Sequence, residues 1–319
     1  MADIKNELGW SRTRMGQFHS CKRSYYYQYY AKWGGWDYRA DELSKTAYRL
    51  SKMTNLPMLV GTAVHTVIQH ILLDLKNIGR IDMPDPAYFA RKNLLTPAYR
   101  DGLAERWRKS PKHHPPLAEL YYGPDPDPET LKESGRKTAN CIENFLQSGI
   151  FRNLQDDDCS NWLAIEPSFE EAKQLKVDGN VVWACPDFAR RVEGDVCEVW
   201  DWKTGKPRAE DEMQLLSYGL FAHEIWGFAP DQIKLCALYL DKEPGPDSVV
   251  SYPCSRERLD SLLVQIRSDF AEMNTLLSDP VQNIPHDPDS HFPMIPEGPT
   301  CGYCFFRQLC DRGAPQKRN

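Results

Sequence analysis

Two aspartates and a lysine lie close together in one segment of the chain, VVWACPDFARRVEGDVCEVWDWKTGK (residues 181–206). Asp201 and Lys203 are two residues apart, so in a strand their side chains leave the same face of the sheet. Asp187 precedes them across a possible hairpin. If the loop consists of residues 193–195, the pairing is symmetric about its centre and Asp187 lies directly opposite Asp201, with Cβ atoms about 5 Å apart. A two-residue loop would place the two carboxylates on opposite faces.

Two adjacent carboxylates repel each other unless a cation lies between them. Asp187 and Asp201 are therefore predicted to bind Mg²⁺ or Mn²⁺, which prefer hard oxygen ligands. Such an ion lowers the pKa of water and stabilises negative charge on a phosphodiester. Lys203 would orient that water and offset the developing charge. The plain alternative for an isolated Asp-x-Lys triplet is a surface ion pair, and only the wider set of residues favours catalysis.

Further side chains extend this constellation. His65 ends the run Gly61-Thr-Ala-Val-His65 and is interpreted either as a packed core residue or as a metal ligand whose nitrogen favours Mn²⁺. Glu166 either orients a water or is a charge on an edge strand. Gln214 and Tyr218 are four residues apart and share one face of a predicted helix. They would position DNA or the lysine, or simply cover the sheet.

The order of these residues resembles the RecB-like branch of the PD-(D/E)XK nuclease superfamily. The matching positions are Gly61 and His65, Glu166, Pro186-Asp187, Asp201-Trp202-Lys203, and Gln214 with Tyr218. The resemblance implies a metal-dependent deoxyribonuclease, often an exonuclease on single strands or duplex ends. It implies catalytic roles for Glu166, Asp187, Asp201, Lys203, Gln214 and Tyr218, and metal binding by His65, Asp187 and Asp201. Many relatives carry Glu where this chain has Asp201, and the family pattern admits either residue.

A second set of residues is typical of metal binding. Cys301, Cys304 and Cys310 form a C-x₂-C-x₅-C run, and Cys21 is the candidate fourth ligand. Spacing alone does not separate zinc from an iron–sulfur cluster. The arrangement resembles the iron–sulfur subgroup of the same nuclease branch, which includes nucleases of CRISPR adaptation and of the AddAB helicase–nuclease. That resemblance implies a [4Fe-4S] cluster on the four cysteines.

The cluster would clamp together two regions roughly 280 residues apart, which constrains the unfolded chain. The tyrosine run 25–30 next to Cys21 is predicted to pack around the cluster, and the alternative is base stacking on a single strand. The remaining cysteines lack metal-ligand spacing and are predicted to be small buried hydrophobes. They are Cys141, Cys159, Cys185, Cys197, Cys236 and Cys254.

The composition of the 319 residues sets further bounds. A net charge of −6 argues against a general nucleic-acid coat protein, but it is compatible with an enzyme that contacts a few phosphates. The chain shows no apolar signal region, and no stretch is judged long enough to span a membrane, so a cytoplasmic location is expected. DNA is the expected partner. Because no helicase motif is present, any helicase, CRISPR or repair partner would be a separate chain.

These residues must be positioned by a fold that the sequence outlines. Helices are predicted over residues 13–32, 58–76, 130–148, 210–226 and 255–278, strands between 162 and 203 and over 233–240, and a loop over 111–128. The predicted class is α/β, with a mixed central sheet flanked by helices. We expect one nuclease domain, with a helical N-terminal part (1–60), a catalytic core (61–280) and a cluster-binding tail (281–319).

Two rival functions remain at this point. A catalytically silent DNA-binding or scaffold subunit would have no need for Asp187, Asp201 and Lys203 together. An iron–sulfur electron carrier would not need the carboxylate–lysine hairpin. The residues therefore favour an enzyme.

Overall fold

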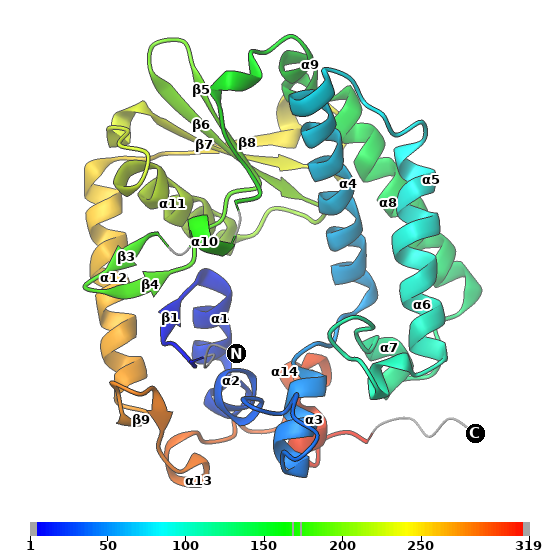
Figure 1. Cartoon of the computed structure of the whole chain (residues 1–319), viewed down its shortest axis with the longest axis vertical. Coiled ribbons are helices and arrows are strands. Elements are labelled where there is room, and N and C mark those ends of the chain that lie inside the picture. Colours follow the sequence, from blue (N-terminus) through cyan, green and yellow to red (C-terminus); the bar gives the residue numbers. More distant parts are fainter. Residues whose placement is uncertain (1–4, 168, 173, 315–319) are drawn as a thin grey trace. The chain divides into compact units, whose positions relative to one another are not determined.

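The computed structural model describes residues 5–167, 169–172 and 174–314 (Figure 1). Residues 1–4, 168, 173 and 315–319 belong to the predicted N-terminal part, strand region and tail, and they lie outside the described residues. The chain divides into two compact units. Unit 1 comprises residues 1–58, 96–131 and 268–319, and unit 2 comprises residues 59–95 and 132–267.

Unit 2 contains a mixed five-stranded sheet in the order β2-β5-β6-β7-β8 (Figure 1). Its strands are β2 (Trp162–Ile165), β5 (Phe188–Val192), β6 (Val196–Lys203), β7 (Ile233–Tyr239) and β8 (Val249–Tyr252). Neighbouring strands run antiparallel except β6 and β7, which are parallel and are connected through helix α11 (Ala209–Glu224). This connection follows the rule that parallel neighbours need a long crossover. A short hairpin of β3 (Lys176–Val177) and β4 (Asn180–Val182) also belongs to this unit.

Helices cover both faces of the sheet. One face carries Phe188, Trp200 and Trp202, which join a buried core with helices α4 (Leu56–Ile78), α8 (Pro128–Gln147) and α9 (Gly149–Gln155). In that core the rings of Phe145 and Trp202 meet edge to face, with centroids 5.2 Å apart. The opposite face contacts α11, which packs on β6 and β7. The predicted α/β class with a mixed, helix-flanked sheet is confirmed.

Helix α4 forms where the sequence has its strongest apolar stripe. The side chain of Asn55 accepts a hydrogen bond from the Met58 N–H, and the helix is followed by Gly79 at φ 71°, whose N–H bonds to the Leu75 carbonyl. The prediction that no stretch reaches membrane-span length is wrong, because this helix is long and apolar enough by length and composition. One stripe of its apolar side chains, which includes Val64 and Ile68, is nevertheless completely buried in the unit 2 core, whereas Leu73 and Ile78 are exposed.

The other elements of unit 2 lie around this sheet. The short helix α5 (Pro86–Ala90) continues into a π-helix at Arg91–Leu95, and α10 (Phe169–Ala172) follows β2. Helix α12 (Arg256–Asn274) begins in this unit. Short 3-10 turns lie at Cys159–Asn161, Pro230–Gln232 and Pro246–Ser248.

Unit 1 is mainly helical. Its core joins Tyr27 and Leu50 from the first segment to Trp107 from the second and Phe306 from the third. Its helices are α1 (Arg12–Ser20), α2 (Lys22–Tyr26), a π-helix at Tyr27–Ala31, α3 (Glu42–Leu50), α6 (Thr96–Leu103), α7 (Ala118–Tyr122), α13 (Pro288–His291) and α14 (Pro299–Tyr303). Short 3-10 turns lie at Arg106–Arg108 and Arg307–Cys310. The unit also holds the two-residue strand β1 (Gly9–Trp10) and the pair β9 (Leu277–Asp279) and β10 (Ile284–Pro285).

The predicted elements and the structure differ at several places. The predicted helix over 13–32 is interrupted at Cys21, whose backbone is extended between α1 and α2. Helices α3, α5 and α6 were not predicted, and α7 lies inside the predicted loop 111–128. The division at residues 60 and 280 stays a prediction. In the structure the segment 96–131 groups with the two ends of the chain in unit 1.

Candidate metal centre and cysteine cluster

The hairpin of β5 and β6 sets the position of the aspartates. Its register pairs Phe188 with Trp200 and Val192 with Val196, which leaves residues 193–195 as the loop. The predicted three-residue loop and its register are therefore confirmed. Asp187 lies directly before β5, and its carboxylate accepts a hydrogen bond of 2.6 Å from the Trp202 backbone N–H.

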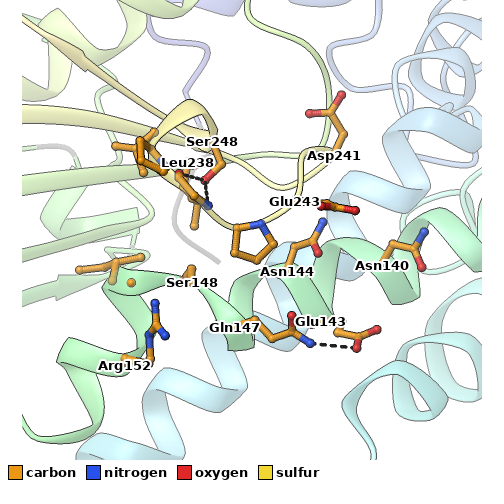
Figure 2. Close-up of a pocket in the computed structure, with 16 residues that line it drawn as sticks. Asn140, Glu143, Asn144, Gln147, Ser148, Arg152, Leu238, Asp241, Glu243 and Ser248 are labelled. Atoms are coloured by element: carbon orange, nitrogen blue, oxygen red, sulfur yellow. Dashed lines mark hydrogen bonds between the residues drawn. The ribbon is translucent and has the colours of Figure 1, made fainter.

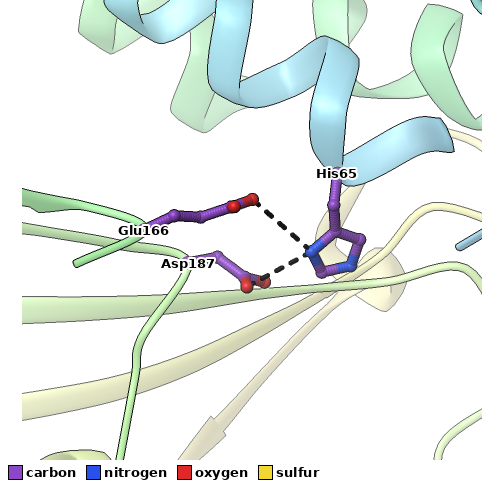
Figure 3. Close-up of side chains that lie close together, drawn as sticks. All are labelled: His65, Glu166 and Asp187. Atoms are coloured by element: carbon purple, nitrogen blue, oxygen red, sulfur yellow. Dashed lines mark ion pairs between the residues drawn. The ribbon is translucent and has the colours of Figure 1, made fainter. Parts of the chain in front are cut away.

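His65, Glu166 and Asp187 bring their ligand atoms within 4.8 Å of one another (Figure 3). They come from α4, from the residue after β2 and from the residue before β5. The His65 Nδ1 lies 3.2 Å from an Asp187 carboxylate oxygen and 4.0 Å from one of Glu166. The other ring nitrogen, Nε2, donates to the Trp202 carbonyl at 2.8 Å, so the Nδ1 lone pair of the neutral ring faces the carboxylates. A backbone bond that fixes the tautomer in this way is typical of metal-binding histidines.

The backbone at Glu166 is unusual. Its φ is 43°, in the left-handed region that residues with a Cβ seldom adopt. Its N–H donates to the Asp187 carbonyl at 2.9 Å, which extends the β2–β5 pairing by one residue. Strain of this kind is often found at functional sites, and here it turns the Glu166 carboxylate toward His65 (Figure 3).

The protonation of this group reflects crowded negative charge. Burial disfavours the charged form of His65, but the carboxylates, Asp187 foremost, outweigh this effect and raise its pKa to about 9. Burial, followed by the charge of Asp187, raises the pKa of Glu166 to about 7. His65 and Glu166 therefore hold protons that a divalent cation would displace. This donor set of one nitrogen and several carboxylate oxygens fits Mn²⁺ or Mg²⁺.

Asp201 lies deeper than Asp187. The residue is 2% exposed, and burial, followed by the charge of Asp187, raises its pKa. The Lys203 ammonium lies 2.6 Å from Asp201 Oδ2 and forms an ion pair with it. Binding of metal by Asp201 stays a prediction.

Gln214 and Tyr218 connect Lys203 to Asp201. The Lys203 ammonium donates to the Gln214 side-chain carbonyl at 2.7 Å, and the Gln214 amide donates to the Tyr218 hydroxyl at 2.6 Å. That hydroxyl in turn donates to Asp201 Oδ1 at 3.3 Å. Of the roles that the sequence left open for this pair, the contacts favour positioning of the lysine.

Asp211 is a further member of this network that the sequence analysis missed. Its carboxylate lies 3.7 Å from the Lys203 ammonium and accepts hydrogen bonds from the Tyr239 hydroxyl at 2.8 Å and the Arg208 backbone N–H at 2.9 Å. It precedes Gln214 by three residues, so both lie on one face of α11. That spacing is a signal from which it could have been predicted.

A cavity of about 460 Å³ opens beside the candidate metal-binding group. His65, Glu166 and Asp187 line it together with Thr62 and Cys185. The prediction that Cys185 is a small buried hydrophobe is wrong, because Cys185 is exposed. It directly precedes Pro186, next to the site, where the chain has left the sheet and no core covers it.

The four predicted cluster ligands line one cavity in unit 1. Cys21, Cys301, Cys304 and Cys310 surround a space of about 410 Å³. Burial raises the pKa of the Cys304 and Cys310 thiols. The Arg312 guanidinium donates to the Cys301 sulfur at 3.1 Å.

The tyrosine run next to Cys21 is largely buried. Tyr25, Tyr27 and Tyr30 are at most 6% exposed. Tyr27 donates from its hydroxyl to the Leu309 carbonyl and packs its ring against Phe306. Tyr27 also lines the cysteine cavity, so packing beside the cysteines is supported for this ring, whereas Tyr25 packs against Phe18 and Tyr30 against Phe292. The rings of Tyr25, Tyr27 and Tyr30 are not accessible to bases.

A second cavity in unit 2, of about 1130 Å³, lies between helices α8 and α9 and the loop after β7 (Figure 2). The Asn144 amide holds this loop by donating to the carbonyls of Leu240 and Lys242. The carboxylates of Glu143, Asp241 and Glu243 line the cavity. Because these charges repel phosphates, we assign no DNA contact to it.

Comparison with known protein families covers most of the chain. No curated protein matches it. A search against known protein families matches the PD-(D/E)XK nuclease superfamily over residues 9–311. This match includes the metal-binding group, the lysine network and all four cysteines of the unit 1 cavity. The chain belongs to the PD-(D/E)XK nuclease superfamily.

Proposed function

We propose that this chain is a metal-dependent deoxyribonuclease that hydrolyses phosphodiester bonds at the unit 2 site, acting on single strands or DNA ends. The observation that carries the proposal is the meeting of His65, Glu166 and Asp187 within 4.8 Å beside the Lys203–Asp201 ion pair. A module that only binds DNA has no need for a buried carboxylate of raised pKa next to a cation. Membership of a nuclease superfamily supports the same conclusion.

The residues would divide the work as follows. His65, Asp187 and Asp201 would hold Mn²⁺ or Mg²⁺, which supplies Lewis acidity toward the phosphodiester and the attacking water. Glu166, with its pKa near neutrality, would accept a proton from that water. The Lys203 ammonium, 19% exposed, would offset negative charge on the phosphate while Gln214 keeps it in place.

We further propose that Cys21, Cys301, Cys304 and Cys310 bind a [4Fe-4S] cluster, as in the RecB-like iron–sulfur subgroup. The sulfurs around a single tetrahedral zinc are about 3.8 Å apart, given Zn–S bonds of about 2.3 Å. Across the described part of the chain, no three of these thiols come within 4.8 Å of one another. A four-iron cluster holds its ligands further apart, so this wider cavity supports it over zinc. Its role would be to clamp the ends of the chain in unit 1, in a reducing, cytoplasmic setting.

The test is cleavage of end-labelled single-stranded and duplex DNA by protein purified without oxygen, in Mn²⁺, Mg²⁺ or EDTA. Asp201→Asn removes one buried charge with little change in shape and should lower the rate at least a hundredfold. The matched control is Asp231→Asn, an exposed aspartate of the same unit, which should cleave like wild type.

The products also show which end is attacked. Metal-dependent cleavage that is lost only in Asp201→Asn supports the proposal. Absence of cleavage by folded, cluster-loaded wild-type protein in every metal would contradict it and favour the silent DNA-binding subunit. Iron content and visible absorbance, measured on the same samples, test the cluster separately.

A further inference from the structure

Exposed aromatic rings gather in one loop of unit 1. With most of the tyrosine run 25–30 buried, the rings open to solvent in this region are Trp36, 49% exposed, and Tyr38, 83% exposed. Both lie between the π-helix that ends at Ala31 and helix α3. Two large rings exposed within three residues offer a surface on which a ligand can stack.

These rings continue a row of aromatics onto helix α3. The Trp36 ring lies edge to face with both Trp33 and Tyr48, with centroid separations of 5.2 Å and 5.9 Å. Tyr48 lies three residues after Lys45 and four before Lys52, so these three share one face of the helix and the turn that follows it. The ammonium of Lys52 lies 5.3 Å from the centre of the Tyr48 ring.

The loop is held in a fixed shape. A Cβ on Gly35 would lie 2.1 Å from the Ser44 backbone oxygen, so only glycine allows the loop to approach α3 this closely. The Asp37 N–H bonds to the Gly34 carbonyl, and the Asp37 carboxylate accepts from the Arg39 N–H at 2.8 Å. Rings on a rigid loop lose little freedom when they bind a ligand.

Cations accompany the rings. The Arg39 guanidinium lies 5.4 Å from the Tyr38 ring centre and 3.4 Å from Asp37, and Lys45 lies 3.3 Å from Glu42. The Arg39–Asp37 pair is exposed, and in the second pair Glu42 is exposed while the Lys45 side chain is 28% exposed. Such pairs contribute little, because water and salt screen them. Arg39 and Lys45 can therefore exchange these carboxylates for phosphates.

We propose that this aromatic–basic face, formed by Trp36, Tyr38, Arg39, Lys45, Tyr48 and Lys52, binds single-stranded DNA, with bases stacked on the rings and phosphates against the cations. Stacking on exposed rings is available only to unpaired bases, and it is tolerant of sequence. The cations Arg39, Lys45 and Lys52 favour a polyanion over an apolar protein segment, although the carboxylates of Asp37, Asp41 and Glu42 in the same segment oppose it. The inference rests on the proposed function in one respect, since it names a single strand as the form of DNA that the nuclease engages.

The experiment measures binding by fluorescence anisotropy, with full-length protein in EDTA so that no cleavage occurs. The probes are a labelled 30-nucleotide oligo-dT, an abasic strand of the same length, and a duplex. The double variant Trp36→Ala/Tyr38→Ala should bind oligo-dT about tenfold more weakly, while the abasic strand binds as it does to wild type. Tyr88→Ala is the matched control, because this ring is 47% exposed with Lys92 5.4 Å from its centre, and it should change nothing.

Two further variants separate stacking from folding and charge. Trp36→Phe keeps an aromatic ring and should retain most of the wild-type affinity. Tyr38→Ala alone changes a side chain that is too exposed to affect folding, so a loss of affinity in this variant reports on stacking. Lys45→Ala/Lys52→Ala should lower the slope of log affinity against log salt by about 1.4 for two phosphate contacts on a single strand.

Unchanged affinity in Trp36→Ala/Tyr38→Ala would overturn the inference, as would an equal loss on the abasic strand or the duplex. Because binding is measured without metal, its outcome is independent of catalysis. If the protein cleaves DNA but these variants bind DNA as wild type does, the proposed binding face is refuted and the nuclease proposal is not. A protein that fails to cleave but shows the predicted losses keeps the face as a single-strand binding surface.

Discussion

Replacement of Lys203 by methionine should destabilise the protein in a strongly pH-dependent way. The ammonium lies 2.6 Å from the Asp201 carboxylate, which is 2% exposed. At that distance the attraction is about 6 kcal/mol for an effective dielectric constant of about 20. The variant does not lose all of this energy, because its folding no longer includes the cost of removing the lysine ammonium from water. Unpaired buried charges of this kind cost about 3 kcal/mol or more.

The sign of the pH effect follows from the raised pKa of Asp201. A carboxyl with a raised folded-state pKa contributes stability that is fully present below its unfolded pKa, about 4, and is lost as pH rises through the folded value. Lys203 opposes this rise in wild type. In the variant, Asp201 can become protonated, which removes the unpaired charge. The stability that the variant loses relative to wild type therefore grows by at most about 1.4 kcal/mol per pH unit above the folded-state pKa of Asp201 in wild type.

The loss should therefore be under about 1 kcal/mol at pH 5.5 and about 2 kcal/mol or more at pH 9, which corresponds to a melting temperature lower by roughly 4–8 °C. The assay is thermal unfolding in EDTA of wild type, Lys203→Met, Asp201→Asn and the double variant. In the Asp201→Asn background, the lysine change should have no pH dependence. An equal loss at both pH values, or a double variant that keeps the pH dependence, would refute the reasoning.

Three other predictions concern the metal site, the lysine network and the cysteines. Mn²⁺ binding should release about one proton per ion near pH 7 and tighten as pH rises toward 9, because His65, with its pKa of about 9, must lose a proton. Titration calorimetry in buffers of different ionisation heat measures this proton release. A binding heat that does not depend on the buffer would count against His65 as a ligand. Asp211→Asn should lower kcat about tenfold with KM little changed, because Lys203 keeps Gln214 but loses a nearby charge, and an unchanged kcat would limit Asp211 to a structural role. Cys304→Ala should lower iron content and melting temperature together, while Mn²⁺ binding in unit 2 stays the same. An unchanged melting temperature in iron-free protein would contradict the proposed role of the cluster in holding the chain ends together.

The parts of the site that could be predicted follow from strict geometric rules. The period of two in a strand places Asp201 and Lys203 on one face, and the symmetric three-residue loop places Asp187 opposite. The helix period places Gln214 and Tyr218 together. These rules depend only on sequence distance, so they hold before any tertiary contact is known.

Other features depend on tertiary contacts, which the sequence does not display. Sequence spacing places Asp211 on the same face of α11 as Gln214, but its contacts with the Lys203 ammonium and the Tyr239 hydroxyl form only when α11 packs on β6 and β7. Helices α5 and α6 are short and have little stability of their own, so no strong pattern marks them. The exposed position of Cys185 results from the path of the chain before β5, and residue type alone suggested burial.

The assembly of unit 1 from three separate segments has a consequence for its synthesis. Its core needs Tyr27, Trp107 and Phe306 at once. At a translation rate of roughly 5–20 residues per second, Cys301 emerges from the ribosome roughly 14–56 s after Cys21. Both segments of unit 2 are complete by then, since they end at Arg267. Nascent chains should therefore form unit 2 first, while Tyr27 and its neighbours stay open to chaperones and Cys21 remains apart from Cys301, Cys304 and Cys310.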